Sequence, residues 1–295
     1  MERESHRSVL TAEVLELLLL KDGMTVLDAT AGAGGHSEAM LERARIRLYA
    51  MDADPLAVGA VSKRLVPYGS RVSVLEANFA DLEAALGTLG IRRIDRALFD
   101  LGWRREQLFS GKGFSFEGDE PLDMSFGEAP RSGFKAADIL NTWSEEALAN
   151  VFFGYGGERY ARRIAKALMQ ARKEAPVATT EKLVRIIASA VPAGYRRGRT
   201  HFATKVFQAL RIAVNDELRA LEKGIRGAWN ILTPGGRIAA ISFHSIEDRV
   251  VKNLFRTLAL EGGSLVTKKP VIASLEERRS NPSARSAKLR VVEKD

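Results

Sequence analysis

An alternation of short apolar strands with helices over the first hundred residues most constrains the fold of this chain. Buried strands are predicted at 25–28, 47–52, 71–75 and 94–99, and a helix begins near Pro55, in the first helical turn that proline favours. Strands that alternate with helices in this way indicate a parallel, doubly wound sheet. The sequence therefore predicts an α/β fold of the Rossmann-like kind.

The fifth strand of this sheet comes late in the chain, at 236–242. About 130 residues separate it from the fourth strand, whereas one crossover helix needs roughly 30 residues. We therefore predict an inserted domain at 104–204 between two parts of the sheet domain, 1–103 and 205–295. Beyond the fifth strand, three further elements are predicted: a helix at 246–260 and strands at 265–272 and 287–292.

The inserted domain is predicted to be mainly helical. Apolar residues follow the i, i+3, i+4, i+7 spacing of an amphipathic helix over 161–168 and again over 183–190, where Thr180 is the expected cap. A continuous crossover helix with one apolar stripe is expected over 203–221. Residues 104–134 are rich in Gly, Phe and Asp and are predicted as ordered loops.

Positive charge is concentrated in one segment of the chain. Residues 158–205 contain 12 Lys or Arg and three Glu, whereas the rest of the chain contains 33 basic and 34 acidic residues. A local cationic block predicts a polyanionic partner such as nucleic acid. The alternative is a solvated helix face without a partner.

Two absences narrow the class of protein. The chain has no run of about 18 apolar residues and no apolar stretch typical of a signal peptide, so we expect a cytoplasmic protein without membrane association. It also contains no cysteine, which excludes disulfides, thiolate zinc sites and iron–sulfur clusters.

A glycine-rich loop, DATAGAGGH over residues 28–36, follows the first strand and opens a helix. Its glycines allow a sharp turn and a close approach to a ligand. The dinucleotide fingerprint requires a glycine where this chain has Ser37. An anionic pyrophosphate needs N–H groups at a helix start, whereas a strand-end carboxylate suits a cationic ligand. We therefore predict an S-adenosylmethionine site built on the acid and the glycines of the loop: Asp28, Gly32, Gly34 and Gly35.

Residues at the ends of the second and third strands extend this predicted site. Asp52 lies 20 residues after Gly32 and can accept hydrogen bonds from both ribose hydroxyls. Asp54 is the alternative, although it is also placed to cap the helix that starts at Pro55. Phe79 follows the third strand, where an adenine ring packs; a place in the core is an equal alternative for this side chain.

Asp100 closes the fourth strand, at the edge where open parallel sheets bind their ligands. An aspartate at the end of an apolar strand is costly unless it is paired or functional. We predict that Asp100 is a hydrogen-bond acceptor beside the transferred methyl group, with a loop cap as the alternative. Because the chain has no cysteine nucleophile, the methyl group is expected to move by direct displacement onto nitrogen or oxygen.

Eight longer strings occur in one order along the chain. They are DATAGAGGHS (28–37), DLG (100–102), GFSF (113–116), PLDM (121–124), YGGER (155–159), FQALRIAVN (207–215), SFHSIEDR (242–249) and ARSAKLR (284–290). On these strings the chain resembles the bacterial MraW/RsmH family throughout its length.

The resemblance implies a Rossmann-like class I S-adenosylmethionine-dependent methyltransferase fold with an inserted helical substrate-binding domain. Members methylate the N4 amine of a cytidine in the decoding region of 16S ribosomal RNA, so the implied partner is that RNA or the small ribosomal subunit. A homodimer is left open, and no metal site is predicted. By motif position, the family's cofactor contacts fall on Gly34, Gly35, His36, Asp52, Phe79, Asp100 and Gln107.

Catalysis is assigned to Asp100, which would accept a hydrogen bond from the amine and stabilise the positive charge that appears on it. Three arginines of the insert are predicted to hold the RNA backbone, and two residues after the fifth strand to line the cytidine pocket: Arg196, Arg197, Arg199, His244 and Asp248. For the last two, the alternative is a helix start with Ser245 as its cap.

The chain departs from the family pattern in four places, at 103–106, 125–126, Phe202 and Ser283. We expect these segments to face the substrate. The alternatives are therefore a divergent paralogue that methylates another RNA position and a non-catalytic ribosome-assembly factor. An enzyme for a small molecule or a protein is a further alternative, whereas the missing glycine argues against a nicotinamide enzyme.

Overall fold

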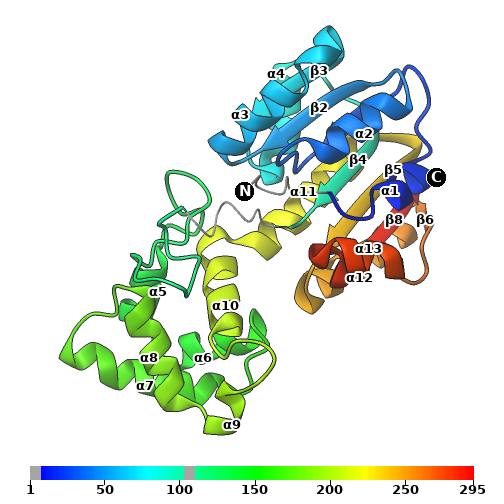
Figure 1. The fold of residues 1–295 in the computed structure, drawn as a ribbon. Coiled ribbons are helices and arrows are strands. Elements are labelled where there is room, and N and C mark those ends of the chain that lie inside the picture. Colours follow the sequence, from blue (N-terminus) through cyan, green and yellow to red (C-terminus); the bar gives the residue numbers. More distant parts are fainter. Residues whose placement is uncertain (1–7, 103–109) are drawn as a thin grey trace. The chain divides into compact units, whose positions relative to one another are not determined.

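A computed structural model of the chain describes residues 8–102 and 110–295. The chain divides into two compact units (Figure 1). The first unit contains Met1–Gly102 and Leu218–Asp295, and the second contains Trp103–Glu217. In the part of the chain that is described, no helix combines the length and the apolar character needed to cross a bilayer.

The first unit is built on one mixed sheet with the strand order β3-β2-β1-β4-β5-β8-β6, in which β7 also pairs with β8. Strands β1 to β5 run parallel, as predicted, and β8 runs antiparallel to β5. Figure 1 shows that both ends of the chain contribute to this sheet. The strands are β1 (Thr25–Asp28), β2 (Arg47–Asp52), β3 (Val72–Glu76), β4 (Ile94–Asp100), β5 (Leu232–Ser242), β6 (Gly263–Leu265), β7 (Val271–Ile272) and β8 (Lys288–Lys294).

Both faces of the sheet are covered by apolar clusters, because successive strand residues point to opposite faces. On β1, Val26 belongs to a cluster with Met40, whereas Leu27 belongs to a cluster with Ile225 and Phe255. Buried apolar residues on both faces explain why these strands read as nearly continuous hydrophobic runs. The helices of this unit are α1 (Thr11–Leu18), α2 (Gly35–Arg43), α3 (Pro55–Arg64), α4 (Leu82–Thr88), α11 (Glu217–Ile231), α12 (Ser245–Leu260) and α13 (Leu275–Ser280).

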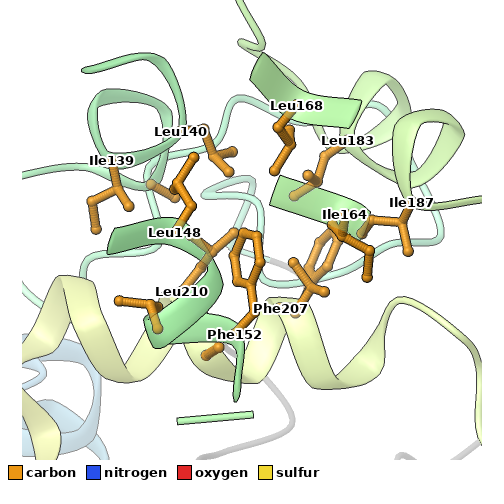
Figure 2. Close-up of a cluster of buried hydrophobic side chains, with 14 of the residues drawn as sticks. Ile139, Leu140, Leu148, Phe152, Ile164, Leu168, Leu183, Ile187, Phe207 and Leu210 are labelled. Atoms are coloured by element: carbon orange, nitrogen blue, oxygen red, sulfur yellow. The ribbon is translucent and has the colours of Figure 1, made fainter. Parts of the chain in front are cut away.

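The second unit is helical and has its own core, as the amphipathic spacing predicts. Ile164, Leu168, Leu183 and Ile187 are all buried in one cluster, together with Phe152 (Figure 2). The helices of this unit are α5 (Ala136–Thr142), α6 (Glu145–Gly154), α7 (Ala161–Glu174), α8 (Thr180–Ala190), α9 (Ala193–Arg196) and α10 (Thr204–Asn215). The described residues between 110 and 134 form loops.

The expectation of one crossover helix over 203–221 is wrong. Two helices occupy the segment, because Asp216 adopts the left-handed conformation with φ 48° and ends α10. Aspartate is one of the few residues that tolerate this conformation. The predicted stripe is therefore divided: Leu210 packs in the core of the second unit, and Leu221 packs against the sheet of the first.

Two smaller predictions also need correction. Thr179, not Thr180, is the N-cap residue of α8, since the buried hydroxyl of Thr180 donates to the Gly118 carbonyl oxygen and accepts from the Glu120 N–H. The strand expected at 265–272 is two short strands, β6 and β7. The segment Lys268-Lys269-Pro270 separates them, and proline cannot donate to a strand ladder.

Candidate active site

The loop after β1 is organised around the carboxylate of Asp28, which is fully buried. The Ser37 hydroxyl donates a 2.6 Å hydrogen bond to Asp28 Oδ2, and the Thr30 N–H donates to Oδ1 at 3.3 Å. Burial raises the pKa of Asp28 to about 6, although these hydrogen bonds oppose the shift. Asp28 therefore supports the loop from inside. Ser37 occupies the position where the dinucleotide fingerprint requires glycine, and its hydroxyl fixes the Asp28 carboxylate.

The end of β2 supports the same loop from the other side. The Gly32 N–H donates to Asp52 Oδ2 at 2.8 Å, and the Asp54 N–H donates to Oδ1 at 2.9 Å. Asp54 itself accepts from the Leu56 N–H at 2.8 Å and is the N-cap of α3. The capping interpretation of Asp54 is thus confirmed, and Asp52 is the acid at the edge of the glycine loop.

Glycine is required where the loop turns into α2. Gly34 has a φ of +83°, a conformation that side chains rarely adopt, and α2 begins at the next residue. A Cβ atom on Gly35 would lie 2.2 Å from the Ser8 hydroxyl oxygen. Both glycines therefore permit a packing that a larger residue would disrupt.

Phe79 follows β3, at the start of a short 3₁₀ turn (Phe79–Asp81), and is half-buried. Its ring meets the buried ring of Phe99 edge to face, with centroids 5.8 Å apart. A Cβ atom on Gly224 of α11 would approach the Phe79 ring to 2.7 Å. One side of the ring is thus fixed by the core while part of it stays accessible, so the two interpretations of Phe79 are compatible.

Asp100 and His36 meet where β4 and α2 adjoin the loop. His36 Nε2 lies 3.5 Å from Asp100 Oδ2, and the Asp100 N–H donates to the Thr30 hydroxyl at 2.6 Å. Burial alone would lower the pKa of His36, but the carboxylate of Asp100, helped by those of Asp28 and Glu277, raises it. A charged imidazole is therefore favoured beside Asp100.

Buried polar atoms at this point have no hydrogen-bond partner among the described residues. They are both ring nitrogens of His36 and Oδ1 of Asp100. Leaving such atoms unsatisfied costs about 1–3 kcal/mol each, so native proteins rarely do it outside functional sites. The carboxylate oxygen of Asp100 can accept from an ammonium group, and the ring N–H groups of His36 can donate to a carboxylate. The methionine portion of S-adenosylmethionine carries both groups. Gln107, the remaining predicted cofactor residue, lies outside the described residues.

The residues after β5 have structural partners. His244, not Ser245, is the N-cap residue of α12: its Nδ1 accepts from the Glu247 N–H at 3.2 Å. Asp248 accepts from Arg290 Nε at 2.7 Å and from Lys288 Nζ at 3.3 Å. Burial raises the pKa of Asp248, but these two cations hold it below its usual value. The helix start accounts for Nδ1 of His244, with the cap shifted by one position from Ser245, whereas the ion pairs account for Asp248. The buried Nε2 of His244 has no hydrogen-bond partner among the described residues and lies 2.8 Å from Glu247 Oε1.

A cluster of cations and aromatic rings occupies the second unit. The Arg159 guanidinium lies 4.9 Å from the centroid of the Tyr160 ring and 4.8 Å from that of Tyr195. The Tyr195 hydroxyl donates to Glu158 Oε2 at 2.6 Å, and the Glu158 side chain is fully buried. The exposed, predicted RNA contacts Arg196, Arg197 and Arg199 follow directly along the chain.

Sequence reasoning missed the members of this cluster other than the three arginines. The string YGGER at 155–159 already contained two of them, and Tyr195 directly precedes Arg196. A tyrosine beside a run of arginines was the available signal, since an aromatic ring and a guanidinium stack favourably. The buried carboxylate of Glu158 had no comparable signal, because its partner lies 37 residues away.

Two of the departures from the family pattern lie inside the second unit. Ser125 is almost fully buried and donates its hydroxyl hydrogen bond to Asp123, and the adjacent Phe126 stacks on Phe114. Phe202 packs against His201, with ring centroids 4.2 Å apart. The expectation that these segments face the substrate is therefore wrong for Ser125. Ser283 is exposed, and 103–106 lie outside the described residues.

Comparison with known proteins places this geometry in a family. The model of the MraW methylase family matches residues 3–295. A protein of Desulfotalea psychrophila is 47% identical over 292 residues, with 98% of each chain covered. One of Nostoc punctiforme is 48% identical over 292 residues, which cover 98% of this chain and 94% of the relative. One of Carboxydothermus hydrogenoformans is 44% identical over 307 residues, with 98% of each covered. All three are named ribosomal RNA small subunit methyltransferase H.

The sheet order, the acid-braced glycine loop and a match over nearly the whole length agree with one another. The chain has the class I methyltransferase fold, whose methyl donor is S-adenosylmethionine. It belongs to the MraW methylase family.

Proposed function

We propose that this protein transfers a methyl group from S-adenosylmethionine to the N4 amine of a cytidine in the decoding region of 16S ribosomal RNA. Relatives at 44–48% identity bear the name of a small-subunit ribosomal RNA methyltransferase, which supports the RNA substrate. The observation that carries the chemistry is Asp100 at the end of β4. Its Oδ1 is buried, accepts no hydrogen bond among the described residues and lies beside His36.

Asp100 addresses the weak nucleophilicity of the amine. The lone pair of cytosine N4 is delocalised into the ring, so the nitrogen attacks poorly while it remains planar. A hydrogen bond from the amine to Asp100 favours the pyramidal nitrogen and stabilises the positive charge that develops there. When bound, S-adenosylmethionine supplies an electrophilic methyl group, which the amine lone pair attacks as the carbon–sulfur bond breaks. The amine then gives up one proton, which Asp100 is placed to accept.

His36 orients the carboxylate of Asp100. Its Nε2 lies 3.5 Å from Asp100 Oδ2, and this carboxylate raises the pKa of His36. With Oδ2 beside the imidazole, Oδ1 of Asp100 is left to accept a hydrogen bond from the amine. Positioning of the nitrogen supplies further acceleration, and the base must leave its stack to reach the site.

The other residues are proposed to bind and orient. Asp52 would accept from the ribose hydroxyls, Phe79 would pack on the adenine, and Asp28 would keep the loop in shape. The glycines and His36 would contact the methionine portion, and Gln107 is included by motif position. In the second unit, the arginines after Tyr195 would hold RNA phosphates. His244 and Asp248 are proposed to border the cytidine while they serve the α12 cap and the ion pair with Arg290.

Mass spectrometry of ribosomal RNA from a strain that lacks the gene tests this proposal. We expect one N4-methylcytidine mark to disappear, to return with the wild-type gene, and to stay absent with Asp100→Ala. Asp81→Ala is the matched control, because Asp81 lies in the same unit and pairs with Lys223 on the surface. An unchanged set of marks in the deletion strain would reject the function. Loss of a mark on a different nucleotide would identify the divergent paralogue instead.

A further inference from the structure

A second concentration of positive charge lies in the first unit. It is not evident from the charge totals, because the residues outside 158–205 contain 33 basic and 34 acidic residues. Residues 245–290 contain ten Lys or Arg and five Asp or Glu. Two of the acids are already neutralised: Asp248 by Arg290 and Lys288, and Glu261 by Arg226. Ten cations and five acids give the segment an excess of five positive charges.

Several of these cations surround one small hollow. Lys252 and Arg256 come from α12, Lys268 from the segment between β6 and β7, and Arg290 from β8. The remaining lining residues are Phe255, Leu265 and Thr267. No acidic residue lines the hollow, whereas some other cations of this unit lie against an acid, such as Arg64, which pairs with Glu38.

Three of the four cations around the hollow have no side-chain partner. Among the described residues, the side chains of Lys252, Arg256 and Lys268 make no hydrogen bond and no ion pair. Lys252 and Arg256 stand four positions apart on one helix, an arrangement of like charges that destabilises the helix. Converging cations without acids are unfavourable in the protein alone, so the arrangement is explained if an anion binds there.

Arg290 is the fixed part of this arrangement. It is only 7% exposed, and its Nε donates to Asp248, which sets the plane of the guanidinium. In the described part of the chain the Nη1 and Nη2 groups of Arg290 donate no hydrogen bond, although the side chain lines the hollow. The carboxylate of Asp248 therefore holds one edge of the buried guanidinium. The two remaining N–H donor groups are suited to a planar, bidentate hydrogen bond with a phosphate.

The hollow is small. A phosphate group would therefore bind at its mouth, where cations from α12, from β8 and from the segment between β6 and β7 can reach its oxygens. Lys252 lies seven residues, roughly 10 Å at 1.5 Å per residue, along α12 from the helix start at the carboxyl end of β5. That end of the sheet also carries Asp100, which is paired in register with Ile241 of β5.

We propose that Lys252, Arg256, Lys268 and Arg290 form a binding site for a phosphodiester group of the RNA backbone, on the methyltransferase unit itself. This inference rests on the proposed RNA substrate and adds a second contact region to the arginines of the helical unit. The site makes no contact with the bases and therefore does not discriminate between sequences. It fixes the position of the RNA strand, as phosphate contacts generally do.

The salt dependence of RNA binding tests this site. A triple variant with Lys252→Gln, Arg256→Gln and Lys268→Gln removes three charges and leaves Arg290 and its buried ion pair intact. Each phosphate contact contributes about 0.7–0.9 to the slope of log affinity against log salt concentration. Because the site binds one phosphodiester group, we expect the slope for a 16S ribosomal RNA fragment to become shallower by about 0.7–0.9, with unchanged calorimetric binding of S-adenosylmethionine.

The matched control removes three charges from the same unit away from the hollow, by Lys63→Gln, Arg92→Gln and Arg93→Gln. These side chains are exposed. An equal change of slope in the control would overturn the site, because net charge alone would then explain the effect. An unchanged slope in the triple variant, in a preparation that still binds and methylates RNA, would also overturn it while leaving the proposed function intact.

A second arm distinguishes the source of the phosphate. Inorganic phosphate is titrated into the wild type and the triple variant by calorimetry in the absence of RNA. Binding of phosphate that depends on the three cations, combined with an unchanged RNA slope, would assign the hollow to a free phosphate and overturn the RNA assignment. A wild-type protein that binds no ribosomal RNA would overturn both the site and the proposed function.

Discussion

The two regions where polar side chains gather in this protein are built differently. Around the glycine loop of the first unit, the carboxylate of Asp28 is enclosed and hydrogen-bonded, and the His36–Asp100 pair retains buried polar atoms without hydrogen-bond partners among the described residues. In the second unit, Arg159 is exposed and lies over the rings of two tyrosines, of which Tyr195 is fixed by a buried carboxylate. A buried site holds its ligand through a few atoms in fixed places, whereas an exposed cationic surface adds many weak and interchangeable contacts.

This difference predicts how substitutions act in each region. In the buried site, one altered atom removes either a chemical function or a support of the loop, so effects are large. On the exposed cluster, solvent and neighbouring cations compensate, so effects are graded and depend on salt. Four substitutions test the comparison in order of decreasing expected effect.

Asp100→Asn is expected to have the largest effect. It keeps the size of the side chain but removes the negative charge that stabilises the developing cation on the amine. Loss of one such electrostatic contact costs about 10²–10³ in turnover number. The measurement is single-turnover methylation of the RNA, with RNA affinity measured in parallel. Turnover within tenfold of the wild type would show that the unpartnered Oδ1 of Asp100 has no part in the chemistry.

Asp28→Asn should change how stability depends on pH. The pKa of Asp28 lies at about 6, above its ordinary 3.8, so the folded protein holds this proton more tightly than the unfolded chain does. The contribution of Asp28 to the free energy of unfolding is therefore fully present below about pH 4. It is lost as the pH rises through 6, by about 3 kcal/mol in total. Asn at this position should flatten that decline in urea unfolding experiments.

The control for the pH experiment is Asp22→Asn. Asp22 is exposed and accepts a hydrogen bond from the Arg45 N–H, so its replacement should leave the decline between pH 4 and 6 in place. If the free energy of unfolding declines by the same amount in Asp28→Asn and in the wild type, the buried carboxyl group of Asp28 is not the cause of the pH dependence.

Gly224→Ala tests the support of the Phe79 ring. The new Cβ atom would lie 2.7 Å from the ring and 3.0 Å from the Phe79 carbonyl oxygen, so the ring must shift. Overpacking of this kind costs about 1–3 kcal/mol, and we expect a loss of S-adenosylmethionine affinity by calorimetry. Gly87→Ala in α4 is the control, because its Cβ atom would meet open space and alanine favours helix. Equal cofactor affinity in both variants would remove Phe79 from the site.

Tyr195→Phe should have the smallest effect on function. It deletes the hydroxyl that donates to buried Glu158 and keeps the ring over which Arg159 lies. The loss of this hydrogen bond costs about 1–3 kcal/mol of stability, while we expect RNA affinity to fall by less than tenfold. Tyr155→Phe is the control, since the Tyr155 hydroxyl has no hydrogen-bond partner among the described residues. A collapse of RNA binding in Tyr195→Phe would break the contrast between the two regions.

Local patterns in the sequence predict much of the first unit. The spacing of apolar residues and glycines predicts β1 to β4, the loop from Asp28 to Ser37 and the acid at the end of β2, because each depends on neighbours within about ten residues. The capping role of Asp54 is similarly local, since it precedes Pro55 and bonds two residues ahead. The failures are also local: an aspartate in the left-handed conformation divides a helix whose apolar stripe is continuous in sequence.

What the sequence by itself determined is therefore the order of strands and helices, the glycine loop and the family. Only the tertiary structure decided that His36 and Asp100 meet and that the Arg290 guanidinium turns toward cations of α12. These partners are far apart along the chain, and no local propensity encodes their distance. The mixed sheet brings them together, because it places β1 beside β4 and β5 beside β8 and so gathers residues that are distant along the chain.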